Sequence, residues 1–166
     1  MSNKVHSLKL KHVKWLLIIS YLIAFLLDNS LSIGISNIFI PSITILILIF
    51  WITNLQSETH FFTATILGIL TDVTMNTLLG SHALILVILT FLILRVRQSF
   101  KNYPTWQQTF LVVFYLYIIQ ILSFFTLQPN LSEPQILYYW LSPLSTIFIW
   151  PITYKIMRLF TDKIET

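Results

Sequence analysis

An acidic residue stands well inside an apolar stretch of the chain, and its side chain is the first candidate for chemistry. Asp72 belongs to the apolar segment that begins at Phe61. If this segment crosses a bilayer, a charge there costs about 2.5–3.5 kcal/mol on insertion scales, so the carboxyl group should face protein or water and have a partner. Two interpretations follow: a site for an ion, a proton or a partner protein, and a packing contact closed by hydrogen bonds. The second is favoured because polar contacts are common where membrane helices meet.

Small and polar residues recur every four positions around this carboxyl group, at Ala64, Gly68, Asp72 and Asn76. On a helix this spacing places all four on one face. Small residues let a neighbouring backbone approach, and the polar residues supply hydrogen bonds there. The face is therefore predicted to pack against another helix, in this chain or in a partner. Gly80 follows, and its access to positive φ allows a tight reversal between two helices.

No other pattern in the sequence points to catalysis or to a bound metal. The chain has no cysteine, and it contains no HExxH, no GxSxG and no phosphate-binding glycine loop. His82 is a lone histidine near the start of the next apolar segment, and one imidazole cannot form a metal site. We therefore expect a protein that is not an enzyme and has no metal and no cofactor.

The composition indicates a membrane protein. Hydrophobic residues make up 56% of the 166 residues and charged residues only 10%, with a mean hydropathy of +0.81. Soluble domains carry about 25% charged residues, whereas a bilayer lets apolar side chains remain on the surface. The expected fold is a single all-α domain of six transmembrane helices, polytopic, at about 15–31, 35–53, 61–76, 80–94, 106–127 and 135–154.

The basic residues predict the orientation. All 10 lysines and arginines precede the first span, follow the sixth, or lie between the fourth and fifth. Because basic residues mark cytoplasmic segments, both termini are expected in the cytoplasm. Arg95, Arg97, Lys101 and Trp106 are candidates for contact with a cytoplasmic partner, although the orientation alone accounts for the charges. Nucleic acid binding is not expected, since no soluble domain offers a basic face.

Prolines and a glutamine are further notable residues inside the spans. Pro41 falls early in the second span, and Pro143 and Pro151 fall in the sixth. Proline removes a helical hydrogen bond, so each is predicted to kink its helix. Bends that serve packing are favoured over a gating hinge. Gln120 lies in the middle of the fifth span and should find a partner on another helix.

Several of these residues together resemble one family. Residues 64–72 read ATILGILTD and residues 77–84 read TLLGSHAL; Trp106-Gln107-Gln108 opens the fifth span, and Trp150-Pro151 lies in the sixth before a basic tail. With the chain length and the six spans, this order is similar to the rod shape-determining protein MreD family. Ala64 departs from the pattern, because the family often has glycine there. Alanine is also a small residue, but the replacement affects how closely a neighbouring helix can approach.

The resemblance implies a non-enzymatic component of the bacterial cell-elongation (rod) complex in the cytoplasmic (inner) membrane. It would help maintain rod shape by linking the cytoskeletal filament to lateral peptidoglycan synthesis. The implied partners are an MreC-like bitopic protein, an MreB-like filament and a RodA-type glycosyltransferase with its transpeptidase; a homodimer is left open. The implied fold is that of the membrane substrate-binding subunits of energy-coupling-factor transporters.

A small transporter, or the substrate-binding subunit of one, is the alternative. It would place Asp72, Asn76 and Gln120 around a central polar pocket. The spans contain few polar groups, and no convincing internal repeat of the kind common in transporters is visible. A membrane enzyme ranks third, because it would need a nucleophile or paired carboxylates.

Overall fold

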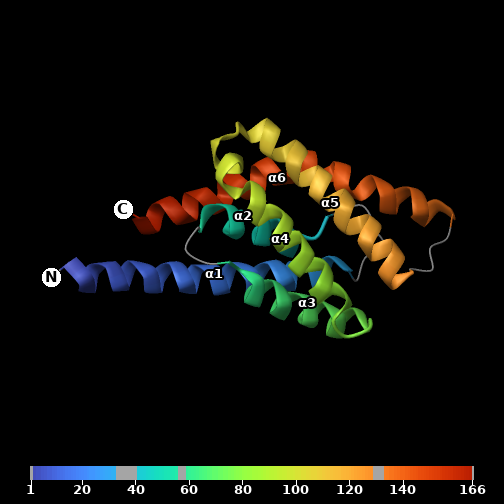
Figure 1. Cartoon of the computed structure of the whole chain (residues 1–166), viewed down its shortest axis with the longest axis horizontal. Helices are drawn as coiled ribbons and strands as arrows, with labels where there is room; N and C mark the ends of the chain where they lie inside the picture. The colour runs from blue at the N-terminus through green and yellow to red at the C-terminus, as the bar shows by residue number, and fades with distance from the viewer. Residues whose placement is uncertain (1, 33–40, 56–58, 129–132, 166) are drawn as a thin grey trace.

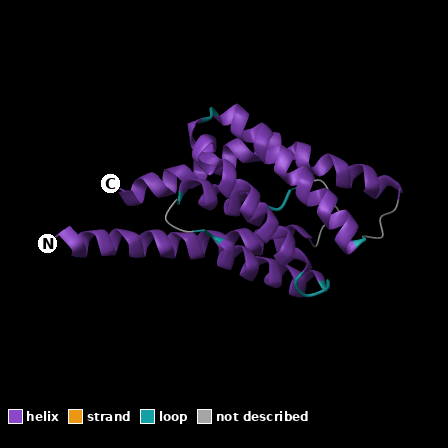
Figure 2. Cartoon of the chain, viewed as in Figure 1, coloured by secondary structure: helices purple, strands orange, loops and turns teal. Residues whose placement is uncertain are grey.

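The described part of the chain is almost entirely helical (Figures 1 and 2). The computed structural model describes residues 2–32, 41–55, 59–128 and 133–165, and side-chain environments for 14–30, 41–55, 59–128 and 135–161. Within these residues there are six helices: α1 (Ser2–Ser32), α2 (Ile43–Asn54), α3 (Phe61–Met75), α4 (Ser81–Asn102), α5 (Thr105–Leu127) and α6 (Glu133–Glu165). The predicted all-α class is confirmed.

The helices run back and forth along the long axis of the molecule, each roughly reversing the direction of the one before (Figure 1). As a result, both termini lie at one end. The last turns of α2 and α4 and the first turns of α3 and α5 lie toward that same end, which we call the terminal end. The last turns of α1, α3 and α5 and the first turns of α2, α4 and α6 lie toward the opposite end, which we call the distal end.

The helices differ in how well they match the thickness of a membrane. Within the described residues, Ser81–Asn102, Thr105–Leu127 and Gln135–Thr161 are long and apolar enough to cross one. Ile43–Asn54 and Phe61–Met75 are apolar but shorter. The predicted second span began at residue 35, and its first part, 35–40, lies outside the described residues. At the terminal end, α4 and α6 continue beyond the predicted ranges into polar sequence, because backbone hydrogen bonds do not require apolar side chains.

The short helix α2 forms the centre of the fold. Every residue from Leu46 to Thr53 is buried, and α1, α4 and α6 all pack against this helix. A helix that is apolar on all sides is expected in such a place. One polar contact ties it to α1, where Trp51 Nε1 donates to Ser20 Oγ at 2.9 Å.

The outer helices have the opposite pattern to a soluble protein. Large apolar side chains are exposed along α1, α3, α5 and α6, including Leu22, Phe62, Phe114 and Phe148. Polar side chains such as Asp72, Thr90 and Thr146 are buried. This distribution suits a lipid environment, in which apolar surface needs no cover.

Two of the three prolines lie where the sequence suggested. Pro143 and Pro151 are inside α6, whereas Pro41 lies ahead of Ile43, the first residue of α2. The expectation that Pro41 kinks the second span is therefore wrong. Its ring occupies the non-helical approach to the Ser42 cap, where a missing N–H costs no helical hydrogen bond.

Pro143 has a consequence for the packing of α5 on α6. A proline has no N–H to donate to the carbonyl four residues earlier, which here belongs to Tyr139. The side-chain amide of Gln120 on α5 donates to that carbonyl instead, and the Tyr139 hydroxyl donates to the Gln120 carbonyl at 3.1 Å. The predicted interhelical partner of Gln120 is thus confirmed, and it is a backbone group released by proline.

Candidate functional site

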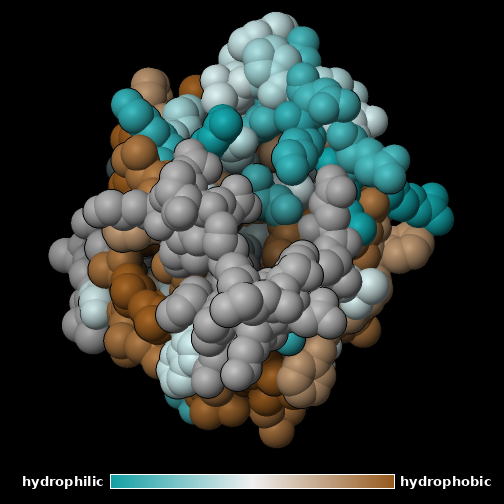
Figure 3. Space-filling model, turned by 90° about the vertical axis from the view of Figure 1, so that its left-hand side faces the viewer, coloured by the Kyte–Doolittle hydropathy of each residue, from teal (hydrophilic) through white to brown (hydrophobic). Residues whose placement is uncertain are grey.

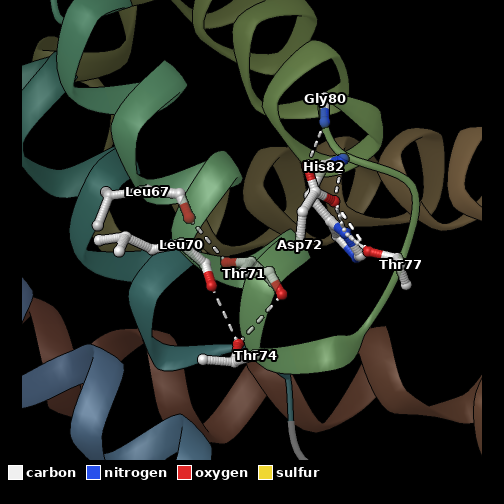
Figure 4. A network of polar contacts seen from close by, with 8 residues as sticks. All are labelled: Leu67, Leu70, Thr71, Asp72, Thr74, Thr77, Gly80 and His82. Atoms are coloured by element: carbon white, nitrogen blue, oxygen red, sulfur yellow. Dashed lines mark hydrogen bonds and ion pairs between the residues drawn. The ribbon is translucent and has the colours of Figure 1, made fainter.

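The carboxylate of Asp72 is the centre of a hydrogen-bond network where α3 turns into α4 (Figure 4). Its Oδ2 accepts from the backbone N–H of Gly80 at 2.7 Å. Its Oδ1 accepts from the His82 N–H at 3.0 Å and from the Thr77 hydroxyl at 2.9 Å. The His82 ring atom Nδ1 lies 2.7 Å from the same Oδ1. Asp72 is 0% exposed, so these groups replace solvent completely.

The local sequence explains why the carboxylate reaches these donors. Helix α3 ends at Met75, and Asn76 adopts the left-handed conformation with φ 52° as the C-cap. Asparagine tolerates that conformation better than most residues. Gly80 then takes φ 98° immediately before α4 begins. The reversal places the free N–H groups of the first turn of α4 next to Asp72, and the positive end of a helix dipole favours a negative group there.

Close backbone packing holds the same two helices together below the turn. A Cβ atom added to Gly68 would lie 2.2 Å from the Cα of Ala83 and 2.4 Å from its backbone nitrogen. Ala64, one turn earlier, is 0% exposed. Only glycine permits this approach at position 68. Of all helix pairs in the described structure, α3 and α4 make the most extensive contact.

The predicted face is therefore largely an intrachain contact. Ala64, Gly68 and Asp72 are buried in the α3–α4 hairpin, and Gly80 forms its turn as expected. Asn76 does not belong to this face, because α3 ends one residue before it and its side chain is exposed. The four-residue spacing assumed a helix through position 76, and the left-handed cap breaks that assumption. Contact between this hairpin and a partner stays a prediction.

His82 is the residue that sequence reasoning missed. In the sequence it is an isolated histidine, but in the structure it supplies both a backbone and a ring contact to Asp72. A signal was present: an acid near a helix end, followed by a glycine turn, should find the first N–H groups of the next helix. Those groups belong to Gly80, Ser81 and His82.

A second carboxylate caps a helix in the same manner at the start of α2. Asp28, near the end of α1, accepts from Ser42 Oγ at 2.7 Å and from the backbone N–H groups of Ile43 at 2.8 Å and Thr44 at 2.9 Å. Ser42 in turn accepts from Ile45 N–H at 3.4 Å. The α1–α2 and α3–α4 hairpins thus share one device, in which an acid of the first helix caps the second. This likeness was not apparent from the sequence.

The predicted cytoplasmic contact residues lie at the terminal end. Arg95, Lys101 and Trp106 are exposed and Arg97 is half-buried, all near the α4–α5 connection. The Arg95 guanidinium lies 4.7 Å from the centre of the Phe91 ring. Hydrophilic side chains gather on this end of the molecule (Figure 3). Contact of these four residues with a partner stays a prediction.

The described residues contain no group of three or more His, Cys, Asp or Glu side chains that could hold a metal ion. The Asp72 network is closed within the chain. Its chemistry is that of a structural clasp between two helices.

A profile of the family described as rod shape-determining protein MreD matches residues 9–160. The chain belongs to the MreD family. The rod shape-determining protein MreD of Haemophilus influenzae is 25% identical over 158 residues, which cover 92% of this chain and 95% of that protein. No solved structure matches. The family and the long apolar helices together identify an MreD-type membrane protein with a role in rod shape.

Proposed function

We propose that this MreD-family chain is a non-enzymatic scaffold of the cell-elongation complex in the bacterial cytoplasmic membrane. It spans that membrane six times, with both termini in the cytoplasm. It works beside an MreC-like bitopic protein, an MreB-like filament and a RodA-type glycosyltransferase with its transpeptidase, and so connects the filament to lateral peptidoglycan synthesis. Its fold is of the kind found in the membrane substrate-binding subunits of energy-coupling-factor transporters.

The alternating course of the helices supports six spans. An α-helix rises about 1.5 Å per residue, so α2 and α3 alone fall short of a hydrocarbon core about 30 Å thick. Each nevertheless runs along the long axis of the molecule, in roughly the opposite direction to the helix before it (Figure 1). The buried position of α2 supports the same conclusion, since a helix surrounded by protein has little need to match the lipid.

One observation supports the scaffold role above all: the intramembrane carboxylate is fully engaged within the chain. Asp72 accepts from three separate residues and is sealed from solvent. A general base, a nucleophile or a proton carrier needs an accessible side chain. The charge instead stabilises a hairpin, as a scaffold with fixed helix positions requires.

The transporter alternative loses the pocket on which it depended. Asn76 lies on an exposed turn, Asp72 is closed into its hairpin, and Gln120 is bonded to α6. These three residues do not line the cavity found among the described residues.

The scaffold proposal is tested by depleting this chain from its own host and restoring it from a plasmid with an affinity tag. Depletion should turn rods into spheres, and the restored protein should recover rods and co-purify the MreC-like protein. Rods that persist without the chain, or a membrane-inserted chain that recovers neither property, would refute the proposal.

The orientation is tested by labelling, because the chain has no native cysteine. In intact cells a membrane-impermeant maleimide should label Asn76→Cys on the exposed α3–α4 turn. It should label Lys101→Cys only after lysis. The reverse pattern would overturn the N-in, C-in orientation.

A further inference from the structure

A cavity of about 290 Å³ lies between the two carboxylate-capped hairpins. Its walls come from the end of α1, the start of α2, the end of α3, the start of α4 and the second half of α5. By the alternation of the helices, all of these segments lie toward the distal end. The cavity is therefore on the side away from the basic residues.

Most of the wall is apolar. Phe25, Ile45, Met75, Ile85, Leu86 and Ile119 form it, so the body of any occupant must be apolar. The size is at the lower limit of small-molecule sites, which are typically about 300–1,000 Å³. It suits one ring or a short alkyl chain.

The polar part of the wall contains an unused hydroxyl group. Thr44 is 4% exposed, and its hydroxyl has no hydrogen-bond partner within the described part of the chain. By contrast, the hydroxyls of Thr71 and Thr74, which also line the cavity, donate to α3 carbonyls at 2.8 Å and 3.1 Å. A buried hydroxyl without a partner is costly unless a ligand or water supplies one.

Two further polar side chains belong to the wall. Asp28 is an acid that lines the cavity beside the α2 cap. The His82 ring also lines the cavity, with its Nδ1 2.7 Å from Asp72 Oδ1. Among the residues that line the cavity there is no lysine and no arginine. The polar wall thus offers the hydroxyl oxygen of Thr44 and the carboxylate of Asp28, and no lysine or arginine would face an anionic group.

We propose that this cavity binds a small amphiphile whose polar end donates hydrogen bonds, a primary amine or a hydroxyl on an apolar body. The amine or hydroxyl lies against Asp28, Thr44 and His82. The apolar body fills the space between Ile45, Leu86 and Ile119. Carboxylates and phosphates are excluded, because they would face the Asp28 carboxylate with no lysine or arginine in the wall to compensate. This binding activity goes beyond the scaffold role and does not depend on it.

The polar end can belong to a free small molecule or to a membrane lipid without phosphate, such as diacylglycerol, which carries a free hydroxyl group. The two sources share one chemistry. They differ in whether the lipid of the surrounding bilayer competes with an added ligand.

The test uses the full chain in nanodiscs of phosphatidylcholine, whose headgroup has no hydrogen-bond donor. Three probes share a phenyl ring but differ at the polar end: phenethylamine, phenethyl alcohol and 3-phenylpropionate. Binding is measured by ligand-detected NMR, and the signal from discs without protein is subtracted to remove partitioning into lipid. The amine and the alcohol should bind saturably, and the carboxylate should bind at least about tenfold more weakly.

Two kinds of variant locate the binding. Thr44→Val removes the hydroxyl but keeps the backbone N–H that bonds to Asp28, and it should weaken the binding of both donor probes about threefold to tenfold. Ser123→Phe fills the cavity from α5 and should abolish binding. Ile119→Trp fills the same space from another position, and it serves if the first filling variant does not fold.

Equal binding of the three probes, undiminished binding to a folded cavity-filling variant, or no binding of either donor probe would each overturn the proposal. A last comparison separates the sources. Adding diacylglycerol to the phosphatidylcholine discs should weaken phenethylamine binding if this lipid occupies the cavity. It should leave the affinity unchanged if the ligand is a free small molecule.

Discussion

The Nδ1 atom of His82 lies 2.7 Å from the Oδ1 atom of Asp72, and this contact joins the end of α3 to the first turn of α4. The two residues are 10 positions apart in the chain. The turn between them contains two residues with positive φ, Asn76 and Gly80. The buried carboxylate of Asp72 thereby joins two helices, and several consequences can be measured.

Replacing Asp72 should destabilise the fold strongly. Asp72→Leu removes the acceptor of four hydrogen bonds and leaves buried donors unsatisfied, so it should lower the free energy of unfolding by roughly 3 kcal/mol or more. Thermal unfolding of the purified protein, followed by tryptophan fluorescence, measures this. Asn76→Ala on the exposed turn is the control and should cost less than Asp72→Leu. An unfolding midpoint for Asp72→Leu equal to that of the wild type would show that the clasp is dispensable.

Replacing the imidazole alone should cost much less. His82→Phe loses the ring contact, but the backbone N–H groups of Gly80 and His82 still reach the carboxylate. We expect a loss of about 1 kcal/mol, the typical net value of one hydrogen bond. The same unfolding measurement ranks the variants. If His82→Phe were as damaging as Asp72→Leu, the ring, and not the helix cap, would be the principal contact.

Adding one methyl group at Gly68 should force α3 and α4 apart. The added Cβ of Gly68→Ala would meet backbone atoms of Ala83 at 2.2 Å and 2.4 Å, and overpacking of this kind costs about 1–3 kcal/mol. Because the clash is with backbone, the second change Ala83→Gly should not restore stability. Full rescue in the double variant would mean that the side chain of Ala83 sets the helix spacing.

The contact between Gln120 and the carbonyl of Tyr139 should depend on Pro143. Gln120→Leu is expected to cost about 1 kcal/mol, because the carbonyl released by proline loses its donor. In a Pro143→Ala background the alanine N–H can donate to that carbonyl, so the cost of Gln120→Leu should fall. A double-mutant cycle on unfolding free energies measures the coupling. If the loss of unfolding free energy in the double variant equals the sum of the two single losses, the two residues are independent.

The sequence indicated much of the fold because the signals involved are local or statistical. Long apolar stretches and one-sided basic residues predicted helices and their alternation, since each depends on composition along the chain. Gly68 lies against the backbone of Ala83 and Gly80 has a positive φ, and both properties follow from the missing side chain that the sequence shows directly. Helix ends were less accurate: Pro41 and Asn76 lie outside the helices they were assigned to, because a cap depends on hydrogen bonds that apolar patterning does not reveal.

The sequence by itself thus determined an all-helical membrane chain, its family, and the need of Asp72, within an apolar segment, for a hydrogen-bond partner. Tertiary structure alone decided which partner that is, why Asp28 and Asp72 act alike, and how Thr44 and His82 come to line one cavity. Hydrogen bonds act over about 3 Å. Whether two residues far apart in the chain come that close depends on the turns and the helix packing, and sequence spacing does not encode that distance.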